Sequence, residues 1–332
     1  MDSKRPYQYR ALRRIATLLL VALTLASCTW VKDDTEECRY GFWLQLHYTY
    51  NILDVEAAPE YINDAFVYVY DTDGNYVRRI DVTRAQLTAN NHRVRVEGLD
   101  EGDYQFVVWS GIGNSPYAVT EDTKTISDFR VQLAATGSTA STQLPDLYFG
   151  ALPTVHYDNR YAVYDVSMMK DTNQLSCLAV SLADDSLTPD NCSLTMTASN
   201  SAMDAHNRLS SPLTVEYTPF QQKAVTIDDP DYGELHGVQF SIKTLRLMAD
   251  SDCRLLLHKK GQDEPVLNIS LPEYIALIGS LYTNLGREVG LQEYLDRQDL
   301  YTVVLLFSEG LDQLLQLRVN SWRVRAYNHL KL

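Results

Sequence analysis

From Tyr40 onward the chain is dominated by short runs in which apolar and polar residues alternate. The first run places an apolar residue at every second position from Phe42 to Tyr48. Because successive side chains of a strand point to opposite faces of its sheet, this period of two predicts a half-buried β-strand. Comparable runs predict strands at residues 65–70, 76–82, 93–97, 105–109, 129–133, 162–168, 175–182, 193–198, 213–217, 223–227, 238–247, 254–258, 266–271, 301–307, 311–319 and 322–327.

Turn residues separate the predicted strands. Residues 71–74 (Asp-Thr-Asp-Gly) join two of the runs, and the Asp-Gly pair supplies the positive φ that a hairpin requires. The same residues begin like a calcium loop, but no distal glutamate follows at the spacing of an EF-hand, so the hairpin is favoured. A glycine-flanked turn before Tyr104 is typical of Greek-key sandwiches, in which the tyrosine packs at a corner between sheets.

Two segments, residues 272–281 and 290–297, instead carry apolar residues at roughly helical spacing. Residues 134–143 are rich in Ala, Ser and Thr, which leaves little to bury and indicates an exposed loop near a boundary. We therefore expect an all-β fold with a short helical insertion in the second of two β-sandwich domains in series, residues 38–155 and 156–332.

Composition narrows the choice of partners. The 332 residues include 43 Asp and Glu against 29 Lys and Arg, a formal charge of −14. Binding to a phosphate backbone requires a basic surface, so we expect no nucleic-acid partner. The charge is also uneven, because residues 1–27 hold five basic residues and one acidic residue, and removing them would change the net charge from −14 to −18.

The basic start precedes an apolar stretch, residues 15–26, which is too short to span a membrane and is typical of a signal peptide. It runs into Leu-Ala-Ser-Cys at residues 25–28, the lipobox pattern of bacterial lipoproteins. We expect cleavage after Ser27 and a diacylglycerol and an N-acyl chain on Cys28, since two or more acyl chains hold a protein durably on a membrane. We expect no other cofactor. The alternative is an ordinary secretory signal that happens to contain a cysteine.

Residues 28–37 form an acidic tether behind the predicted lipidation site. Lys32 is followed by Asp33 and Asp34, and a lysine with acidic residues at this place resembles the export signal of Bacteroidetes lipoproteins displayed on the outer cell surface. We therefore expect a lipid-anchored protein of the outer membrane that faces outward. A solvated spacer that keeps the folded body clear of the lipid headgroups is the alternative.

The sequence lacks the common catalytic and metal-binding motifs. Its seven histidines are scattered, and no H-E-x-x-H, G-x-S-x-G or P-loop spacing occurs, so we expect neither a catalytic residue nor a metal site. A pair of glycosidase carboxylates stays open, because spacing in sequence says nothing about spacing in the fold. Exposed aromatic residues could form a carbohydrate-binding face, but Trp43, Trp109 and Trp322 lie inside strand patterns and are expected in the core.

Four cysteines remain for the folded body: Cys38, Cys177, Cys192 and Cys253. They would allow two disulfides in three connectivities, and buried free thiols are an equal alternative. Because no C-x-x-C occurs, the sequence indicates neither a zinc ribbon nor a redox motif.

Several segments together resemble one known family. They are residues 38–42 and 50–54, residues 66–71 with Gly74, and residues 291–297 with 319–322. Their sequences are similar to those of the FimB/Mfa-type fimbrial anchor lipoproteins, minor subunits of the type V fimbriae of Bacteroidetes. The run Gln-Glu-Tyr-Leu-Asp-Arg at residues 292–297 is the most specific part of the match.

The resemblance implies two transthyretin-like Greek-key domains and a non-enzymatic role at the base of a fimbria. There the protein would hold shaft pilin subunits to the outer membrane and limit the length of the fimbria. Subunits of such fimbriae join by strand exchange, in which an extended segment of one subunit completes the sheet of another. A candidate donor lies near the C-terminus, with Trp322, Val324, Ala326 and Tyr327 as partner contacts; its alternative role is simply the last strand of the second domain.

The resemblance also implies maturation of related subunits by trypsin-like cleavage after arginine. Here Arg78, Arg79 and Arg84 lie in or beside predicted strands. We therefore expect the chain to keep its first strand and to remain a terminal member of the fimbria. The sequence leaves two other roles open, a tip or accessory adhesin subunit and a surface glycan-binding lipoprotein.

Overall fold

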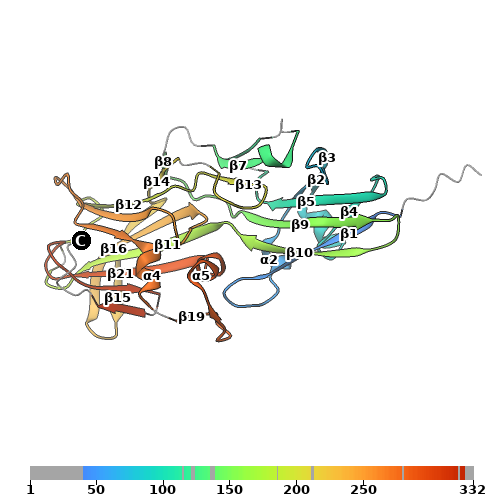
Figure 1. Ribbon diagram of the computed structural model, residues 1–332. Coiled ribbons are helices and arrows are strands. Elements are labelled where there is room, and N and C mark those ends of the chain that lie inside the picture. Colours follow the sequence, from blue (N-terminus) through green and yellow to red (C-terminus); the bar gives the residue numbers. More distant parts are fainter. Residues whose placement is uncertain are drawn as a thin grey trace, which may run out of the picture. The chain divides into compact units, whose positions relative to one another are not determined.

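The computed structural model describes residues 40–113, 116–120, 124–134, 139–184, 186–210, 213–278, 280–320 and 322–325. The chain divides into two units, Met1–Tyr40 and Gly41–Leu332, and the second contains every element described below. Its fold is all-β with sandwich-like layers, as the alternation predicts (Figure 1). The transthyretin-like detail stays a prediction. The predicted signal peptide and tether, residues 1–37, lie outside the described residues.

The N-terminal half forms a seven-stranded sheet. Strand β1 lies inside it, parallel to β10 on one side and antiparallel to β4 on the other. The order of the strands is β3-β2-β5-β9-β10-β1-β4. Their bounds are β1 Phe42–Tyr50, β2 Ala65–Asp71, β3 Tyr76–Val82, β4 Arg93–Val96, β5 Gly102–Ser110, β9 Tyr148–Tyr157 and β10 Val163–Lys170.

Strands β2 and β5 are buried on both faces. Val67 and Val108 pack into a core made of side chains from residues 42–168, whereas Tyr68 and Trp109 pack into a larger core shared with the C-terminal half. Double-sided burial explains why residues 65–70 form a continuous apolar run instead of an alternating one. Trp109 is fully buried, as predicted.

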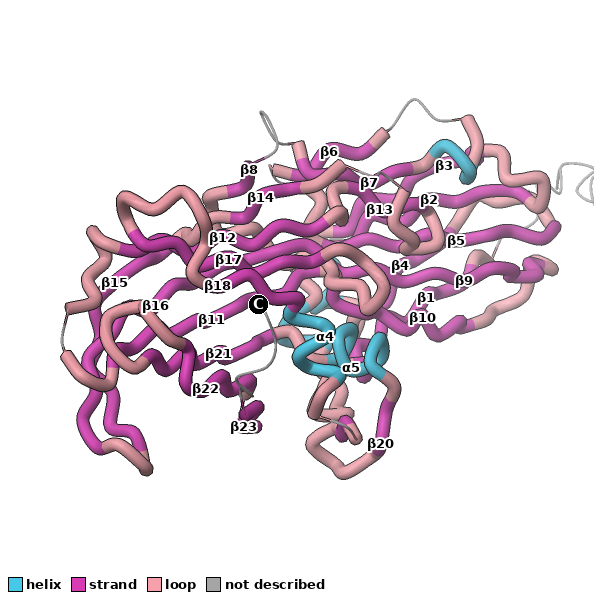
Figure 2. The backbone as a smooth tube through the Cα atoms, turned by 60° about the vertical axis from the view of Figure 1, so that its left-hand side comes forward, coloured by secondary structure: helices cyan, strands magenta, loops and turns pink. Residues whose placement is uncertain are grey.

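Two further sheets form the C-terminal half and enclose the rest of the larger core (Figure 2). The six-stranded sheet has the order β15-β16-β11-β21-β22-β23, and the five-stranded sheet has the order β18-β17-β12-β14-β8. The bounds are β8 Thr139–Ala140, β11 Thr172–Ser181, β12 Cys192–Ala198, β14 Val215–Tyr217, β15 Gln221–Asp229, β16 Gly233–Leu245, β17 Cys253–Lys259, β18 Leu267–Ser270, β21 Leu300–Phe307, β22 Leu314–Val319 and β23 Trp322–Arg325.

Each half contributes a short strand that pairs with a strand of the other half. Strand β8, from the stretch predicted as a loop, pairs with β14, while β6 (Tyr117–Val119) and β7 (Arg130–Leu133) form a small sheet with β13 (Ala202–Asp204). The chain passes from the seven-stranded to the six-stranded sheet at Asp171, between β10 and β11. The domain boundary predicted between residues 155 and 156 falls within β9.

Strand β9 has no counterpart among the predicted strands. Its register against β5 shifts between Tyr104 and Phe106, whose partners are Val155 and Leu152. Pro153 therefore sits at a bulge, where a strand tolerates the missing N–H of proline. Because a proline usually argues against a central strand, the pattern of apolar and polar residues does not predict β9.

The two predicted helices are present as α4 (Leu271–Ala276) and α5 (Leu291–Arg297). Between them lies a two-stranded excursion formed by β19 (Leu281–Tyr282) and β20 (Glu288–Val289). The first helix was predicted to continue to residue 281, but it ends at Ala276. The pattern did not predict three other helical segments, which are α2 (Ala58–Tyr61), α3 (Arg84–Ala89) and a 3₁₀ turn at Ile126–Asp128.

The predicted hairpin and the predicted tyrosine corner both form. Gly74 has a φ of +80°, and the Asp71 carboxylate accepts hydrogen bonds from the backbone N–H and side chain of Asn75, at 2.8 and 3.0 Å. That carboxylate therefore stabilises the turn, as expected for a hairpin. The Tyr104 hydroxyl donates to the Asp100 carbonyl at 3.0 Å, which pins the corner before β5.

Candidate functional site

Helix α5 brings together three of the segments that carry the family resemblance. Arg297 reaches the loop after β1, where it contacts Asn51 and Asp54, and Tyr294 meets Asn320 in the turn between β22 and β23. We call this contact region the motif junction; its members are Tyr50, Asn51, Asp54, Glu293, Tyr294, Arg297 and Asn320. It joins positions that lie more than 240 residues apart in the sequence, since Asn51 and Arg297 are in direct contact.

The loop after β1 is held in shape by its own polar groups. The buried Asn51 side chain donates to the carbonyls of Tyr48 and Val55, both at 2.8 Å, and accepts from the Leu53 N–H at 3.1 Å. Asp54 adopts a φ of +55°, a left-handed conformation that aspartate tolerates better than most residues. The loop therefore presents one carbonyl and one carboxylate to helix α5.

Arg297 occupies the centre of the motif junction with only 9% of its side chain exposed. Its Nη1 donates to Asp54 Oδ1 at 2.9 Å and to the Asn51 carbonyl at 3.2 Å, and its Nε donates to Glu293 at 2.8 Å. The guanidinium also lies over the Tyr50 ring, 4.0 Å from the ring centroid. A planar group with five donors suits this set of partners in a way that a lysine ammonium could not.

Arg287 gives the same two carboxylates a second, more exposed partner. It donates to Glu293 at 2.8 Å and to Asp54 at 3.3 Å. Hydrogen bonds from Thr283 and from Arg287 lower the pKa of Asp54, and those from Arg287 and Arg297 lower the pKa of Glu293. Two carboxylates held ionised in this way cannot act as the proton donor of a glycosidase pair, which requires a raised pKa.

The other side of α5 ties the helix to the segment after β16. Asp296 accepts from Arg246 through both carboxylate oxygens, each at 2.8 Å. Gln292 accepts from the Ala249 N–H at 2.8 Å and donates to the Leu247 carbonyl at 3.2 Å. The polar side chains of the Gln-Glu-Tyr-Leu-Asp-Arg run thus bond several other parts of the fold, which gives this run a structural role as a connector.

A second polar cluster lies where the chain changes sheets. Lys170 contacts Asp299 at 2.7 Å and Asp146 at 3.2 Å, and Lys243 also bonds Asp146. Burial by itself would raise the pKa of Asp146, but the nearby ammonium groups of Lys170 and Lys243 outweigh this effect and lower the pKa. These ions are mutually compensated, so the cluster stabilises the changeover and leaves no unbalanced charge for a ligand.

Asp171 is fully buried beside this changeover. Its Oδ1 accepts from the Asn207 side-chain amide at 2.9 Å, while Asp171 Oδ2 and Asn207 Oδ1 have no hydrogen-bond partner among the described residues. Burial raises the pKa of Asp171 to about 7, although Arg246 acts in the opposite direction.

The predicted donor strand lies at an edge. Strand β23 contains Trp322 and Val324. Among the described strands it pairs with β22 alone and is the outermost strand of the six-stranded sheet (Figure 2). Ala326 and Tyr327 lie outside the described residues, as do Cys28, Lys32, Asp33, Asp34 and Cys38.

The remaining predicted site features were tested where the chain is described. Cys177, Cys192 and Cys253 are buried free thiols. Across the described ranges, no group of three His, Cys, Asp or Glu side chains could hold a metal ion. In the same part of the chain, no helix is long and apolar enough to cross a bilayer.

Comparisons with known proteins agree with the fold. The model of the family of fimbrillin-A associated anchor proteins Mfa1 and Mfa2 matches residues 35–328. The solved structure of the fimbrial anchor protein Mfa2 from Porphyromonas gingivalis is 17% identical, with a TM-score of 0.65 over 86% of this chain and 99% of that one. Comparison with curated protein sequences gave no match.

Two solved structures from Bacteroides thetaiotaomicron are also similar. One, provisionally described as an adhesin, is 25% identical, with a TM-score of 0.76 over 86% of this chain and 97% of its own. The other, provisionally described as polysaccharide binding, is 23% identical, with a TM-score of 0.73 over 87% of this chain and 98% of its own.

The strands and sandwich-like layers define a β-rich protein whose fold is that of the solved fimbrial anchor protein Mfa2. Because the family model covers most of its length, the chain belongs to the family of fimbrillin-A associated anchor proteins Mfa1 and Mfa2. This is a family of fimbrial structural proteins, so a fimbria-associated role follows.

Proposed function

We propose that this protein is a non-enzymatic lipoprotein of the outer membrane that anchors a type V fimbria to the cell surface and limits its length. The observation that carries the proposal is the match of residues 35–328 to a family of fimbrial anchor proteins. The contacts of the family-specific run support a structural role, because its polar side chains bond other parts of the chain.

Lipid on Cys28 would provide the membrane attachment. Each buried methylene contributes about 0.8 kcal/mol, so a diacylglycerol and an N-acyl chain together hold a protein far more firmly than one chain does. The acidic segment behind the cysteine, with Lys32, Asp33 and Asp34, would then direct the protein to the outer face of the cell.

Strand β1 suggests how the protein could limit the length of the fimbria. Phe42 and Leu44 of this strand are fully buried, and Leu46 is nearly so. In strand exchange a subunit accepts its neighbour through a vacant position in a sheet. A subunit that keeps β1 fills this place with its own chain, and we propose that it thereby ends the polymer and joins the shaft pilin through another edge.

Replacing Cys28 with alanine tests the anchoring role in a strain that lacks the wild-type gene. We expect the variant in the soluble fraction and the fimbriae in the culture medium, because no acyl chain can be attached. Ser27→Ala is the matched control, since it keeps a small residue before the cysteine and should leave the protein in the membrane fraction.

Two results would contradict the proposal. A Cys28→Ala protein that stays with the membranes would show that lipid does not hold it. Fimbriae of normal length that remain attached to cells lacking the gene would remove the anchoring role altogether, and a change in adhesion alone would instead favour a tip or accessory subunit.

Truncating the chain after Asn320 tests whether the C-terminal segment takes part in strand exchange. Since β23 pairs only with β22 at the edge of its sheet, we expect the truncated protein to stay folded. If the segment is the donor, the shaft pilin should no longer co-purify with the truncated protein. Undiminished co-purification would mean that β23 is only the last strand of its own sheet.

A further inference from the structure

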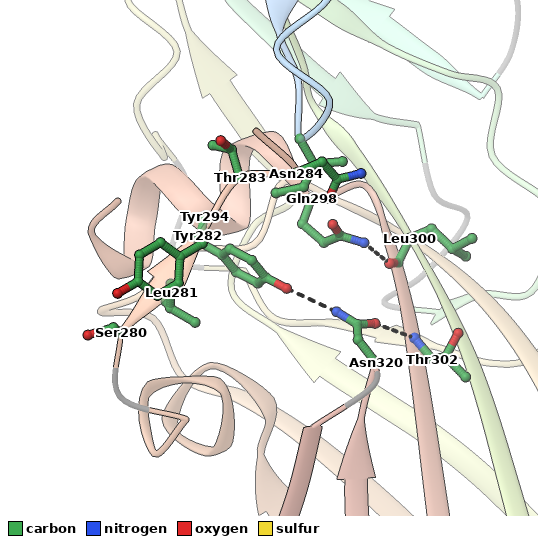
Figure 3. Close-up of a pocket in the computed structure, with 11 residues that line it drawn as sticks. Ser280, Leu281, Tyr282, Thr283, Asn284, Tyr294, Gln298, Leu300, Thr302 and Asn320 are labelled. Carbon is green, nitrogen blue, oxygen red and sulfur yellow. Dashed lines mark hydrogen bonds between the residues drawn. The ribbon is translucent and has the colours of Figure 1, made fainter. Parts of the chain in front are cut away.

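A pocket of about 680 Å³ opens beside the motif junction. Its walls come from the loop after β1, the β19–β20 excursion, helix α5 with the start of β21, and the turn before β23 (Figure 3). Its volume lies within the range of small-molecule sites in proteins, about 300–1,000 Å³. The lining residues are Ile52, Ser280, Leu281, Tyr282, Thr283, Asn284, Tyr294, Gln298, Leu300, Thr302 and Asn320.

None of these eleven residues is Asp, Glu, Lys, Arg or His, although 22% of the whole chain is charged. The nearest ionic groups of the motif junction, such as Asp54 and Arg297, are paired with one another. The lining instead combines hydroxyl and carboxamide groups with tyrosine rings. Such a site offers nothing to neutralise a charged ligand, so it suits an uncharged, hydroxyl-rich one.

Several polar groups of the lining are available to a ligand. Tyr294 accepts a hydrogen bond from Asn320 at 3.0 Å, which leaves its own O–H as a donor. Within the described residues, the Asn284 side chain, Gln298 Oε1 and the Thr302 hydroxyl form no hydrogen bond with the protein, since the bonds at these residues come from the Asn284 backbone, Gln298 Nε2 and the Thr302 backbone. The pocket thus holds both donors and acceptors, as recognition of hydroxyl groups requires.

An aromatic surface accompanies these groups. The Tyr282 side chain is exposed, with 46% of the residue's surface accessible, and Figure 3 shows its ring beside that of Tyr294, with Asn320 and Thr302 across the pocket. An open ring face gives an apolar surface on which the C–H face of a sugar ring can stack while the hydroxyl groups bond at its rim.

The same geometry disfavours an added peptide strand. The start of β21 extends past the end of β22, so its edge borders the pocket, but its backbone is already occupied. The Thr302 N–H donates to Asn320 Oδ1 at 3.0 Å, and the Asn320 N–H donates to the Thr302 carbonyl at 2.6 Å. Gln298 caps the Leu300 carbonyl. A ladder of main-chain bonds would first have to displace these caps.

We infer that the pocket between helix α5 and the β19–β20 excursion binds a neutral glycan. The Tyr282 ring stacks on one sugar, and the side chains of Asn284, Gln298 and Thr302 bond its hydroxyl groups. The inference does not depend on the anchoring role, because the pocket belongs to the folded body and requires neither lipid nor pilin.

The test measures binding of the purified full chain to an array of neutral hexose and N-acetylhexosamine oligosaccharides, with sialylated and sulfated versions as charged comparators. We expect selective binding of neutral members, and a loss of at least tenfold in affinity for Tyr282→Ala. Tyr232→Ala is the matched control, because Tyr232 is similarly exposed at 49% but lies on the β15–β16 turn, which does not line the pocket. It should bind like the wild type.

Each other outcome would overturn the inference. Absence of binding to any neutral glycan, equal binding of charged and neutral members, or an unchanged affinity in Tyr282→Ala would each exclude the proposed site. A peptide from the shaft pilin that binds the wild type but not Tyr282→Ala would show that the pocket takes a polypeptide instead. Cell fractionation with the Cys28→Ala variant reports on anchoring separately, so the two proposals can fail independently.

Discussion

Replacing Arg297 with methionine is expected to lower the free energy of unfolding by about 3–5 kcal/mol, the usual cost of removing one partner from a buried ion pair. Methionine roughly retains the length of the side chain but donates to none of Asn51, Asp54 and Glu293. Arg287 would then be the remaining cation at the two carboxylates among the described residues, and Asp54 would keep its hydrogen bond from Thr283. Urea unfolding of the mature chain, followed by circular dichroism, measures the change.

Arg287→Met is the matched control for this prediction. Arg287 bonds the same two carboxylates, but 47% of its side chain is exposed, so solvent already screens its interactions. Because exposed ion pairs contribute little to stability, we expect a much smaller loss for Arg287→Met than for Arg297→Met. Equal losses of unfolding free energy in the two variants would contradict the expectation that the burial of Arg297 makes its interactions more stabilising than those of Arg287.

Asp171→Asn is expected to stabilise the protein near neutral pH by roughly 4 kcal/mol, at about 1.4 kcal/mol for each unit by which burial raises a pKa. The pKa of Asp171 rises from 3.8 to about 7 on folding. The folded state therefore binds a proton that the unfolded state lacks, and its stability falls as pH rises from about 4 to about 7. An asparagine stays neutral throughout this range and can still accept the hydrogen bond from the Asn207 side chain.

Unfolding free energies of the wild type and of Asp171→Asn, measured from pH 4 to pH 8, check this expectation. The difference between them should be small at pH 4 and should grow until about pH 7. Asp146→Asn provides a contrasting control. The pKa of Asp146 is lowered, so the stability that its charge contributes is present above about pH 4 and is lost only as the pH falls further, and the destabilisation by Asp146→Asn should stay nearly constant from pH 4 to pH 8. Parallel curves for the wild type and Asp171→Asn would contradict the assignment.

The period of two was sufficient to predict most strands, because one buried face leaves a clear alternation. The run at residues 65–70 is instead continuously apolar, because β2 is buried on both faces, as Val67 and Tyr68 show. The pattern missed β9 because Pro153 sits at its bulge. It missed β8 because a two-residue strand in a polar stretch leaves no periodic signal.

The candidate sites were harder to predict than the strands. The motif junction depends on a contact between Asn51 and Arg297, and no local pattern reports which distant segments meet. The one indication that these segments act together was the family resemblance, because the segments that carry it include those of the motif junction. The sequence does not single out the aromatic residues of the pocket, because Tyr282 and Tyr294 are two of 22 tyrosines.

The placement of β1 has a mechanical consequence. As the first strand after the predicted tether, it is where tension between membrane and fimbria would enter the folded body. Because β10 and β4 flank it on both sides, a pull along β1 loads two ladders of hydrogen bonds simultaneously in shear. Resistance to such a force depends on the rate of unfolding and not on equilibrium stability. Pulling single molecules from the N-terminus would therefore measure a property on which the strength of attachment depends.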